Sequence, residues 1–176
     1  MRFKFFLNEM DENSIGLVVG RFQPPHIGHK QIFERVAKNH NKFYILLVKG
    51  AKSSKDKKRN PFPSDLQKEM LQEILPNNGE VLEVPNAFIP KTVEVTDFES
   101  NSFVLYAGPD RAKKYEDLID KMPEGTELSI VPVNFDRSNV SASTVREALK
   151  HEDFDIFKKV MPDELLKYWE TLLEFI

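Results

Sequence analysis

Two histidines, His26 and His29, stand in a segment whose other residues are typical of a turn, GRFQPPHIGH (Gly20–His29). A turn uses glycine, proline, asparagine or aspartate for its backbone conformation, but it has no need of imidazoles. A helix is predicted to begin near Gly28, and the free N–H groups at a helix N-terminus favour an anion. Imidazole donors at the same place would hold phosphate oxygens and stabilise the charge that develops on a leaving pyrophosphate.

Two other interpretations of the histidine pair are open. The histidines could be surface residues at the start of a helix, or they could bind a metal ion. The HExxH spacing of zinc peptidases is absent, and the chain has no cysteine that could complete a zinc site. We therefore predict that the protein itself binds no metal ion. The GxGxxG and P-loop fingerprints are absent as well.

A second segment with surplus polar groups is VSASTVR (Val140–Arg146), which precedes the helical pattern EALK. One interpretation is a plain helix cap, in which Thr144 and Glu147 form a capping box. A cap needs one hydroxyl, however, whereas this segment offers three hydroxyls and a guanidinium. These groups in one helical turn predict a triphosphate site, to which the hydroxyls are contributed by Ser141, Ser143 and Thr144.

Charged residues gather in two further loops. Six basic residues occur from Lys49 to Arg59, among them Lys52, and they form either a solvated face or a surface that steers polyphosphate substrates. No aromatic residues are interleaved with them, which argues against RNA binding. In the turn Gly108–Arg111, Asp110 could accept a hydrogen bond from a base or a ribose. Equally, Pro109 could be the first residue of a helix whose dipole Asp110 complements.

Alternating strands and helices must position these segments. Apolar runs predict strands at Ser14–Gly20, Phe43–Gly50, Val81–Val84, Phe103–Gly108 and Leu128–Val133. Helical spacing is found after His29 and at Pro63–Leu75, Arg111–Met122, Ser143–Lys150, Asp153–Val160 and Pro162–Phe175. No clear pattern covers the stretch from 85 to 102.

This alternation is typical of an α/β protein with a Rossmann-like open parallel sheet, helices on both faces and a C-terminal helical extension. We expect one domain over residues 1–176, with its core at about 14–150 and C-terminal helices at 151–176. Ligands bind beyond the carboxyl ends of the strands in such sheets. All four unusual loops lie on that edge: Gly20–His29, Gly50–Asn60, Gly108–Arg111 and Asn134–Ser143.

Composition limits the class of protein. The formal net charge of -3 argues against a protein coated for nucleic acid, and the lack of cysteine fits a reducing compartment. No apolar run is long enough for a membrane span, and the first residues do not form a signal peptide. We expect a cytoplasmic protein without membrane attachment. Its oligomeric state stays open, with a homo-oligomer among the options.

Taken together, His26-x-Gly28-His29 after a first strand and Ser141-x-Ser143-Thr144-x-Arg146 before a late helix resemble the HxGH nucleotidylyltransferase superfamily. Its members have a Rossmann-like fold and transfer a nucleotidyl group from ATP or CTP to a phosphate. Within the superfamily, the segment GRFQP from Gly20 and the segment Asn60-Pro61-Phe62 are most similar to archaeal-type and phage nicotinamide mononucleotide adenylyltransferases. The resemblance spans Gly20 to about Leu149.

One departure concerns the acceptor. The archaeal enzymes usually carry a tryptophan in the middle of the chain that stacks on nicotinamide. The tryptophan of this sequence, Trp169, lies instead in a leucine-rich C-terminal segment that suggests plain helix packing. Phe88 or Phe98 could take its place, or either could belong to the core.

The resemblance implies transfer of AMP from ATP, with Mg²⁺, to a phosphorylated acceptor, in the first instance nicotinamide mononucleotide, which gives NAD and pyrophosphate. A cytidylyltransferase that uses CTP and a small phosphorylated acceptor is one alternative, and a non-catalytic nucleotide- or RNA-binding module is another. The implied catalytic residues are His26, His29, Lys49 and Arg146. The implied nucleotide-binding residues are Gly20, Arg21, Phe22, Gln23, Pro24, Gly28, Lys52, Gly108, Asp110, Arg111, Val140, Ser141, Ser143 and Thr144. Acceptor contacts are expected from Asn60, Phe62 and Phe88.

Overall fold

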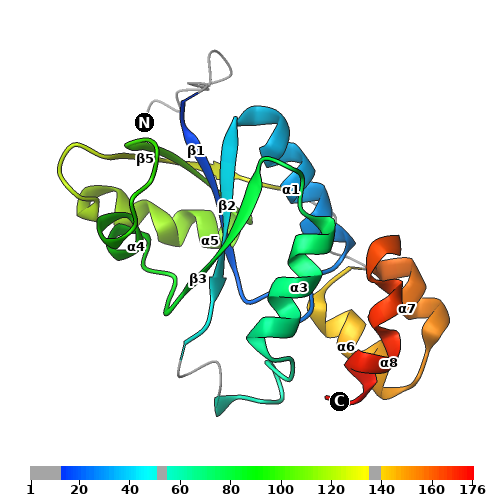
Figure 1. Ribbon diagram of the computed structural model, residues 1–176. Helices are drawn as coiled ribbons and strands as arrows, with labels where there is room; N and C mark the ends of the chain where they lie inside the picture. The colour runs from blue at the N-terminus through cyan, green and yellow to red at the C-terminus, as the bar shows by residue number, and fades with distance from the viewer. Residues whose placement is uncertain (1–12, 51–54, 135–139) are drawn as a thin grey trace.

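A five-stranded parallel sheet forms the centre of the molecule (Figure 1). The computed structural model describes residues 13–50, 55–134 and 140–176. The strand order is β3-β2-β1-β4-β5, so the chain runs outward from β1 to β3 and then crosses to the other side of β1. The strands are β1 (Ile15–Gly20), β2 (Lys42–Val48), β3 (Gly79–Val84), β4 (Ser102–Ala107) and β5 (Glu127–Pro132). The order therefore reverses between β1 and β4, which is where open α/β sheets bind ligands.

Helices cover both faces of this sheet (Figure 1). On one face lie α1 (Ile27–Asn39), α3 (Ser64–Ile74), α6 (Ala142–Lys150), α7 (Phe154–Val160), the 3₁₀ helix η2 (Asp163–Tyr168) and α8 (Trp169–Leu173). On the other lie α4 (Ile89–Val95), α5 (Pro109–Tyr115) and the 3₁₀ helix η1 (Glu116–Lys121). The predicted fold class is confirmed.

Alternation along β1 divides the core into two clusters, because successive side chains of a strand point to opposite faces. Ile15 and Leu17 pack in the cluster under α4 and η1, whereas Val18 packs in the cluster under α1, α3 and the C-terminal helices. Gly16 faces α1 closely: a Cβ atom there would lie 2.5 Å from Cγ1 of Val36. The glycine therefore lets the helix that carries both histidines at its start lie directly on the strand.

All five predicted strands are present, with ends that shift by a residue or two. The unassigned stretch contains α4, which has Pro90 in its first turn and three β-branched residues of low helix propensity after it. The predicted helix Arg111–Met122 begins at Pro109 and continues as 3₁₀ turns from Glu116. The predicted helix Pro162–Phe175 is likewise a 3₁₀ segment followed by α8.

The C-terminal helices are held to the rest of the fold by both apolar and charged contacts. The ring centroid of Trp169 lies 4.8 Å from that of Phe157 and 5.2 Å from that of Phe154, which confirms the predicted packing role. The ion pairs Lys30–Glu164 (2.6 Å) and Lys167–Glu73 (2.7 Å) join the extension to α1 and α3. None of the helices in the described ranges has both the length and the apolar character that a bilayer span requires.

A buried polar network joins the end of α1 to the sheet. Nδ1 of His40 lies 2.9 Å from the carbonyl oxygen of Ser14, and its Nε2 lies 2.9 Å from the hydroxyl of Tyr106. A carbonyl can only accept, so Nδ1 carries the proton and Nε2 accepts from Tyr106. Burial lowers the pKa of His40, and the hydrogen bond to Ser14 opposes this shift in part. The fold therefore selects the neutral ring.

We expect acid to destabilise the protein through His40. The unfolded chain binds a proton on this ring near pH 6.5, whereas the folded protein binds it only at lower pH. The stabilising contribution is thus complete above about pH 6.5 and is lost as the pH falls toward the folded pKa, by at most about 1.4 kcal/mol per pH unit. Urea unfolding measures the free energy of unfolding at about pH 7.5 and at about pH 5.5. The decrease between these pH values should be smaller for His40→Gln than for the parent protein. The exposed His151→Gln is the control. An unchanged pH dependence in His40→Gln would refute this role.

Candidate functional site

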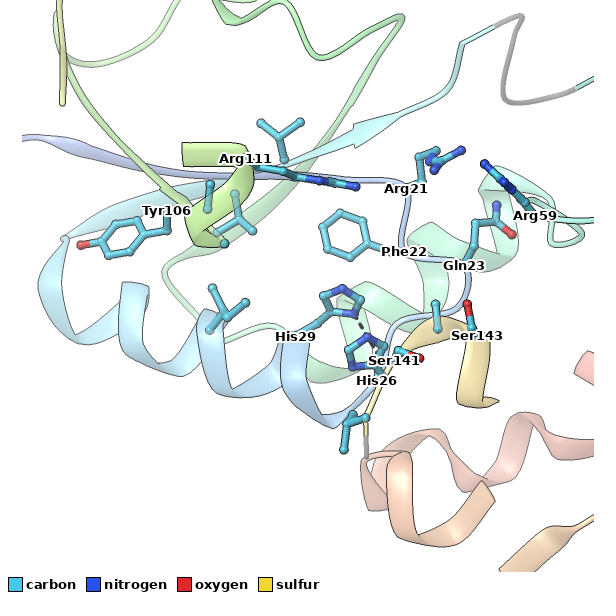
Figure 2. Close-up of a pocket in the computed structure, with 18 of the residues that line it drawn as sticks. Arg21, Phe22, Gln23, His26, His29, Arg59, Tyr106, Arg111, Ser141 and Ser143 are labelled. Atoms are coloured by element: carbon cyan, nitrogen blue, oxygen red, sulfur yellow. Dashed lines mark hydrogen bonds between the residues drawn. The ribbon is translucent and has the colours of Figure 1, made fainter. Parts of the chain in front are cut away.

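A cavity of about 500 Å³ opens at the carboxyl edge of the sheet, beside the ends of β1 and β4 (Figure 2). The two predicted phosphate motifs meet there. His26 and His29 reach it from the start of α1, and Ser141 and Ser143 reach it from the start of α6. Segments that are more than a hundred residues apart in the sequence therefore share one cavity.

The two imidazoles stack on each other at the N-terminus of α1, with ring centroids 3.8 Å apart. Nδ1 of His26 accepts a hydrogen bond from the backbone N–H of Gly28, and Nδ1 of His29 accepts one from the backbone N–H of His26, both at 3.2 Å. A neutral ring whose Nδ1 accepts carries its proton on Nε2. The local fold thus selects Nε2–H donors on both residues, which is the form that can donate to a phosphate oxygen.

Phe22 supports His29 from the preceding turn. The Phe22 ring is buried and meets the His29 ring edge to face at 4.9 Å. Its backbone has a φ of 47°, a left-handed conformation that is strained for a bulky residue. The side-chain amide of Gln67 on α3 holds this turn, because it donates to the carbonyls of Arg21 and Phe22, the latter at 2.9 Å.

Gln23 connects the three segments on which the family resemblance rests. Its side chain exchanges two hydrogen bonds with the backbone of Phe62: Nε2 donates to the carbonyl at 2.9 Å, and Oε1 accepts from the N–H at 3.0 Å. Its own carbonyl accepts from Nη1 of Arg146 at 2.7 Å. The histidine turn, the Asn60–Phe62 loop and the start of α6 are therefore fixed relative to one another.

Positive charge dominates the cavity. No carboxylate is among its lining residues in the described ranges, whereas four guanidinium groups are: that of Arg146 and those of Arg21, Arg59 and Arg111, which Figure 2 labels. Burial lowers the pKa of Arg146, the charge of Arg21 lowers it further, and Glu147 opposes the shift in part. Asp56, which lies 3.8 Å from Nε of Arg59, also compensates part of the charge, but guanidinium groups outnumber these carboxylates, which favours a bound polyanion.

The start of α6 differs in detail from the expected cap. Ser141 is the N-cap residue, and its Oγ accepts from the backbone N–H of Thr144 at 3.1 Å. The interpretation in which Thr144 and Glu147 form a capping box is therefore wrong. Oγ of Ser143 accepts from Nη2 of Arg146 at 3.2 Å, so this hydroxyl orients the guanidinium. One hydroxyl caps the helix and a second one positions the arginine.

Most predicted site residues line this cavity, while several do not. Those that line it are Gly20, Arg21, Phe22, Gln23, His26, His29, Asn60, Gly108, Arg111, Val140, Ser141, Ser143 and Arg146. Pro24, Gly28, Asp110 and Thr144 adjoin it in the chain without being among its lining residues. Pro109 and Asp110 occupy the first turn of α5, as the structural interpretation predicts, and the contact of Asp110 with a base or a ribose stays a prediction.

The remaining predicted residues lie elsewhere. Lys49 and Phe62 line a second cavity of about 640 Å³, and Nζ of Lys49 pairs with Glu83 at 3.2 Å. Phe88 is 42% exposed and lines neither cavity, and Phe98 packs against the second core cluster. Lys52 lies outside the described residues.

Sequence reasoning missed several residues of this site. Tyr106 and Tyr115 line the cavity without a motif to mark them, and Arg59 was marked only as the last residue of the basic run. Gln67 had a signal that could have been used: it is a polar residue on the apolar face of the predicted helix, four positions before Leu71. A buried amide on such a face needs hydrogen-bond partners, and here the partners are the carbonyls of the histidine turn.

The family model described as cytidylyltransferase-like matches residues 17–148. No curated protein sequence matches at a significant level.

Several solved structures share the fold. A bifunctional NMN adenylyltransferase/ADP ribose pyrophosphatase from Francisella tularensis superposes with a TM-score of 0.64 at 19% identity, over 93% of this chain and 49% of that one. The same protein complexed with AMP and a manganese ion gives 0.59 at 16% identity, over 92% and 52%. The nicotinic acid mononucleotide adenylyltransferase of Plasmodium falciparum, complexed with APC, gives 0.55 at 13% identity, over 93% and 98%. This chain thus spans about half the length of the Francisella protein.

Proposed function

The chain belongs to the cytidylyltransferase-like family, and we propose that within it the protein transfers AMP from ATP to nicotinamide mononucleotide, releasing pyrophosphate and forming NAD. The observation that carries this proposal is the convergence of two Nε2–H imidazole donors and four guanidinium groups on one cavity at the switch point of the sheet. ATP and the mononucleotide are chosen on the sequence resemblance. The Francisella and Plasmodium proteins are both named for adenylyl transfer, the first with NMN and the second with nicotinic acid mononucleotide as acceptor.

The reaction is an in-line displacement at phosphorus. A phosphate oxygen of the acceptor forms a bond to the α-phosphorus of ATP, while the bond from that phosphorus to the oxygen bridging to the β-phosphate breaks. Pyrophosphate leaves with the electron pair. The acceptor phosphate is already an anion at neutral pH, so the protein need not supply a general base. The chain's contribution is positioning and charge stabilisation.

Each group has a distinct part in this mechanism. His26 and His29 donate to oxygens of the α- and β-phosphates, where negative charge grows in the transition state. Arg146, oriented by Ser143, holds the departing phosphates as a planar two-pronged donor. Arg21 and Arg59 neutralise the remaining charge of the polyphosphate.

A divalent cation fits this site as a companion of the substrate and not as a resident of the protein. Within the described ranges no carboxylate side chain lines the cavity, and no three histidine or carboxylate groups lie together as metal ligands do. Mg²⁺ prefers oxygen ligands and is commonly held by substrate phosphates. The expected Mg²⁺ would therefore enter bound to the triphosphate, whose charge it partly neutralises.

Pyrophosphate release tests the proposal. ATP and CTP are each incubated with a panel of phosphorylated acceptors that includes nicotinamide mononucleotide, nicotinic acid mononucleotide and glycerol phosphate. Release with ATP and nicotinamide mononucleotide is expected. Release with CTP and not with ATP would overturn the donor, and release with another acceptor alone would overturn the acceptor. No release with any pair, together with tight nucleotide or RNA binding, would identify a non-catalytic module.

A further inference from the structure

A second cavity adjoins the proposed reaction site. Its volume is about 640 Å³, and Gln23 and Asn60 line both cavities. Its other walls come from the end of β2, the loop before α3, the first turn of α3 and Phe175, which follows α8. A molecule whose phosphate lies among the histidines can therefore extend past Gln23 and Asn60 into this second space.

The second cavity has an aromatic wall made by two distant parts of the chain. Phe62 is buried and fixed through its backbone by Gln23. Phe175 meets the Phe62 ring edge to face, with centroids 6.3 Å apart, yet it remains 40% exposed. Pro61 and Pro63 add apolar surface beside them. Lys49, Lys57 and Ser64 make other parts of the lining polar, so the aromatic wall suits one flat ring of a ligand that also carries polar groups.

A polar feature stands at the border of the two cavities. Asn60 is 9% exposed, and its Nδ2 donates to the carbonyl of Asp56 at 3.1 Å. Its Oδ1, however, has no hydrogen-bond partner among residues 13–50, 55–134 and 140–176. A buried amide oxygen without a partner is destabilising, and this one is closed to solvent, so a ligand hydroxyl or N–H would reach it after a small movement of the Asn60 side chain. Sugar hydroxyls between a phosphate and a ring meet that description.

We propose that the second cavity holds the far end of the acceptor and that Phe175 makes the protein prefer acceptors that end in a flat ring. This inference rests on the proposed nucleotidyl transfer and names a specificity residue for it. The C-terminal extension then serves the reaction as well as the fold. Acceptors that end in a short flexible chain leave the aromatic wall exposed and bind more weakly.

Phe175→Ala tests the proposal, with Phe154→Ala as its matched control. Phe154 is a phenylalanine of the same extension with a similar exposed fraction, 43%, and it lines neither cavity. The probes are nicotinamide mononucleotide and ribose 5-phosphate, which carries the same phosphate and sugar without the ring. Calorimetry measures the dissociation constant of each, and steady-state kinetics measures KM for the mononucleotide and for ATP.

Phe175→Ala should weaken mononucleotide binding roughly three- to tenfold, the usual size of one aromatic contact, and raise its KM by a similar factor. Ribose 5-phosphate binding and the KM for ATP should stay unchanged, and Phe154→Ala should change none of these values. Unchanged mononucleotide binding, or an equal loss for both probes, overturns the inference. If no pyrophosphate forms with any substrate pair but Phe175→Ala still weakens the ring-bearing probe selectively, the proposed reaction fails while the ring site stands.

Discussion

Replacing His29 with alanine is expected to lower kcat by about 10²–10³-fold, the usual effect of removing one donor to a charge that develops in the transition state. The Nε2–H group of His29 is set by the acceptor role of its Nδ1, so the wild-type donor is already oriented before the substrate binds. Its contribution grows as charge builds on the phosphates, and KM for ATP should therefore change much less than kcat. Steady-state pyrophosphate release measures both constants.

Two variants make this test specific. His151→Ala removes an exposed imidazole of the α6 C-terminus and should leave turnover at the parent value. His29→Gln restores an N–H donor on a more flexible side chain, so its turnover should lie between that of His29→Ala and the parent. Turnover of His29→Ala within a few-fold of the parent would remove His29 from the reaction. Thermal unfolding of each variant shows whether α1 is still formed.

The fold and the two segments with surplus polar groups could be predicted from the sequence, because both depend on local signals. Apolar runs of strand length predicted all five strands, and parallel strands bring their carboxyl ends to one edge whatever the loops contain. Imidazoles in a turn and surplus hydroxyls before a helix marked the two segments that meet there. Topology explains why they are near each other: the first segment follows β1 and the second follows β5, which lies one strand beyond β4 on the same side of β1, so both lie at the carboxyl edge of the sheet.

What the sequence could not show is how those segments hold one another. The contacts between Gln23 and Phe62, and between Arg146 and the Gln23 carbonyl, join a side chain to a backbone group across the fold. Backbone N–H and C=O groups occur at almost every position, so no residue pattern in the sequence indicates which of them a side chain will contact. A different limit applies to Lys49, which lines the second cavity: its charge is paired with Glu83 on the neighbouring strand, and the register of two strands that are far apart in the sequence is not visible in either segment.

Replacing Arg146 is expected to lower the activity of the protein without lowering its stability. Burial and the charge of Arg21 lower the pKa of its guanidinium, so the positive charge is unfavourable in the fold without a ligand. Arg146→Met removes that charge at the cost of the hydrogen bonds to the Gln23 carbonyl and to Ser143. We expect the Tm of the unliganded protein to be unchanged or higher, while kcat/KM for ATP falls about 10²–10³-fold.

The loss of activity in Arg146→Met should differ in kind from the loss in His29→Ala. Arg146 binds phosphate oxygens before and during the reaction, so KM for ATP should rise while kcat falls, and the increase in Tm that ATP gives to the parent should disappear. Arg146→Lys keeps the charge without the planar fork and should recover part of the binding but little of the turnover. Arg35→Met, at an exposed position of α1, controls for the loss of one positive charge. A large drop in Tm for Arg146→Met with kcat/KM preserved would mean that Arg146 supports the histidine turn through Gln23 and does not bind the nucleotide.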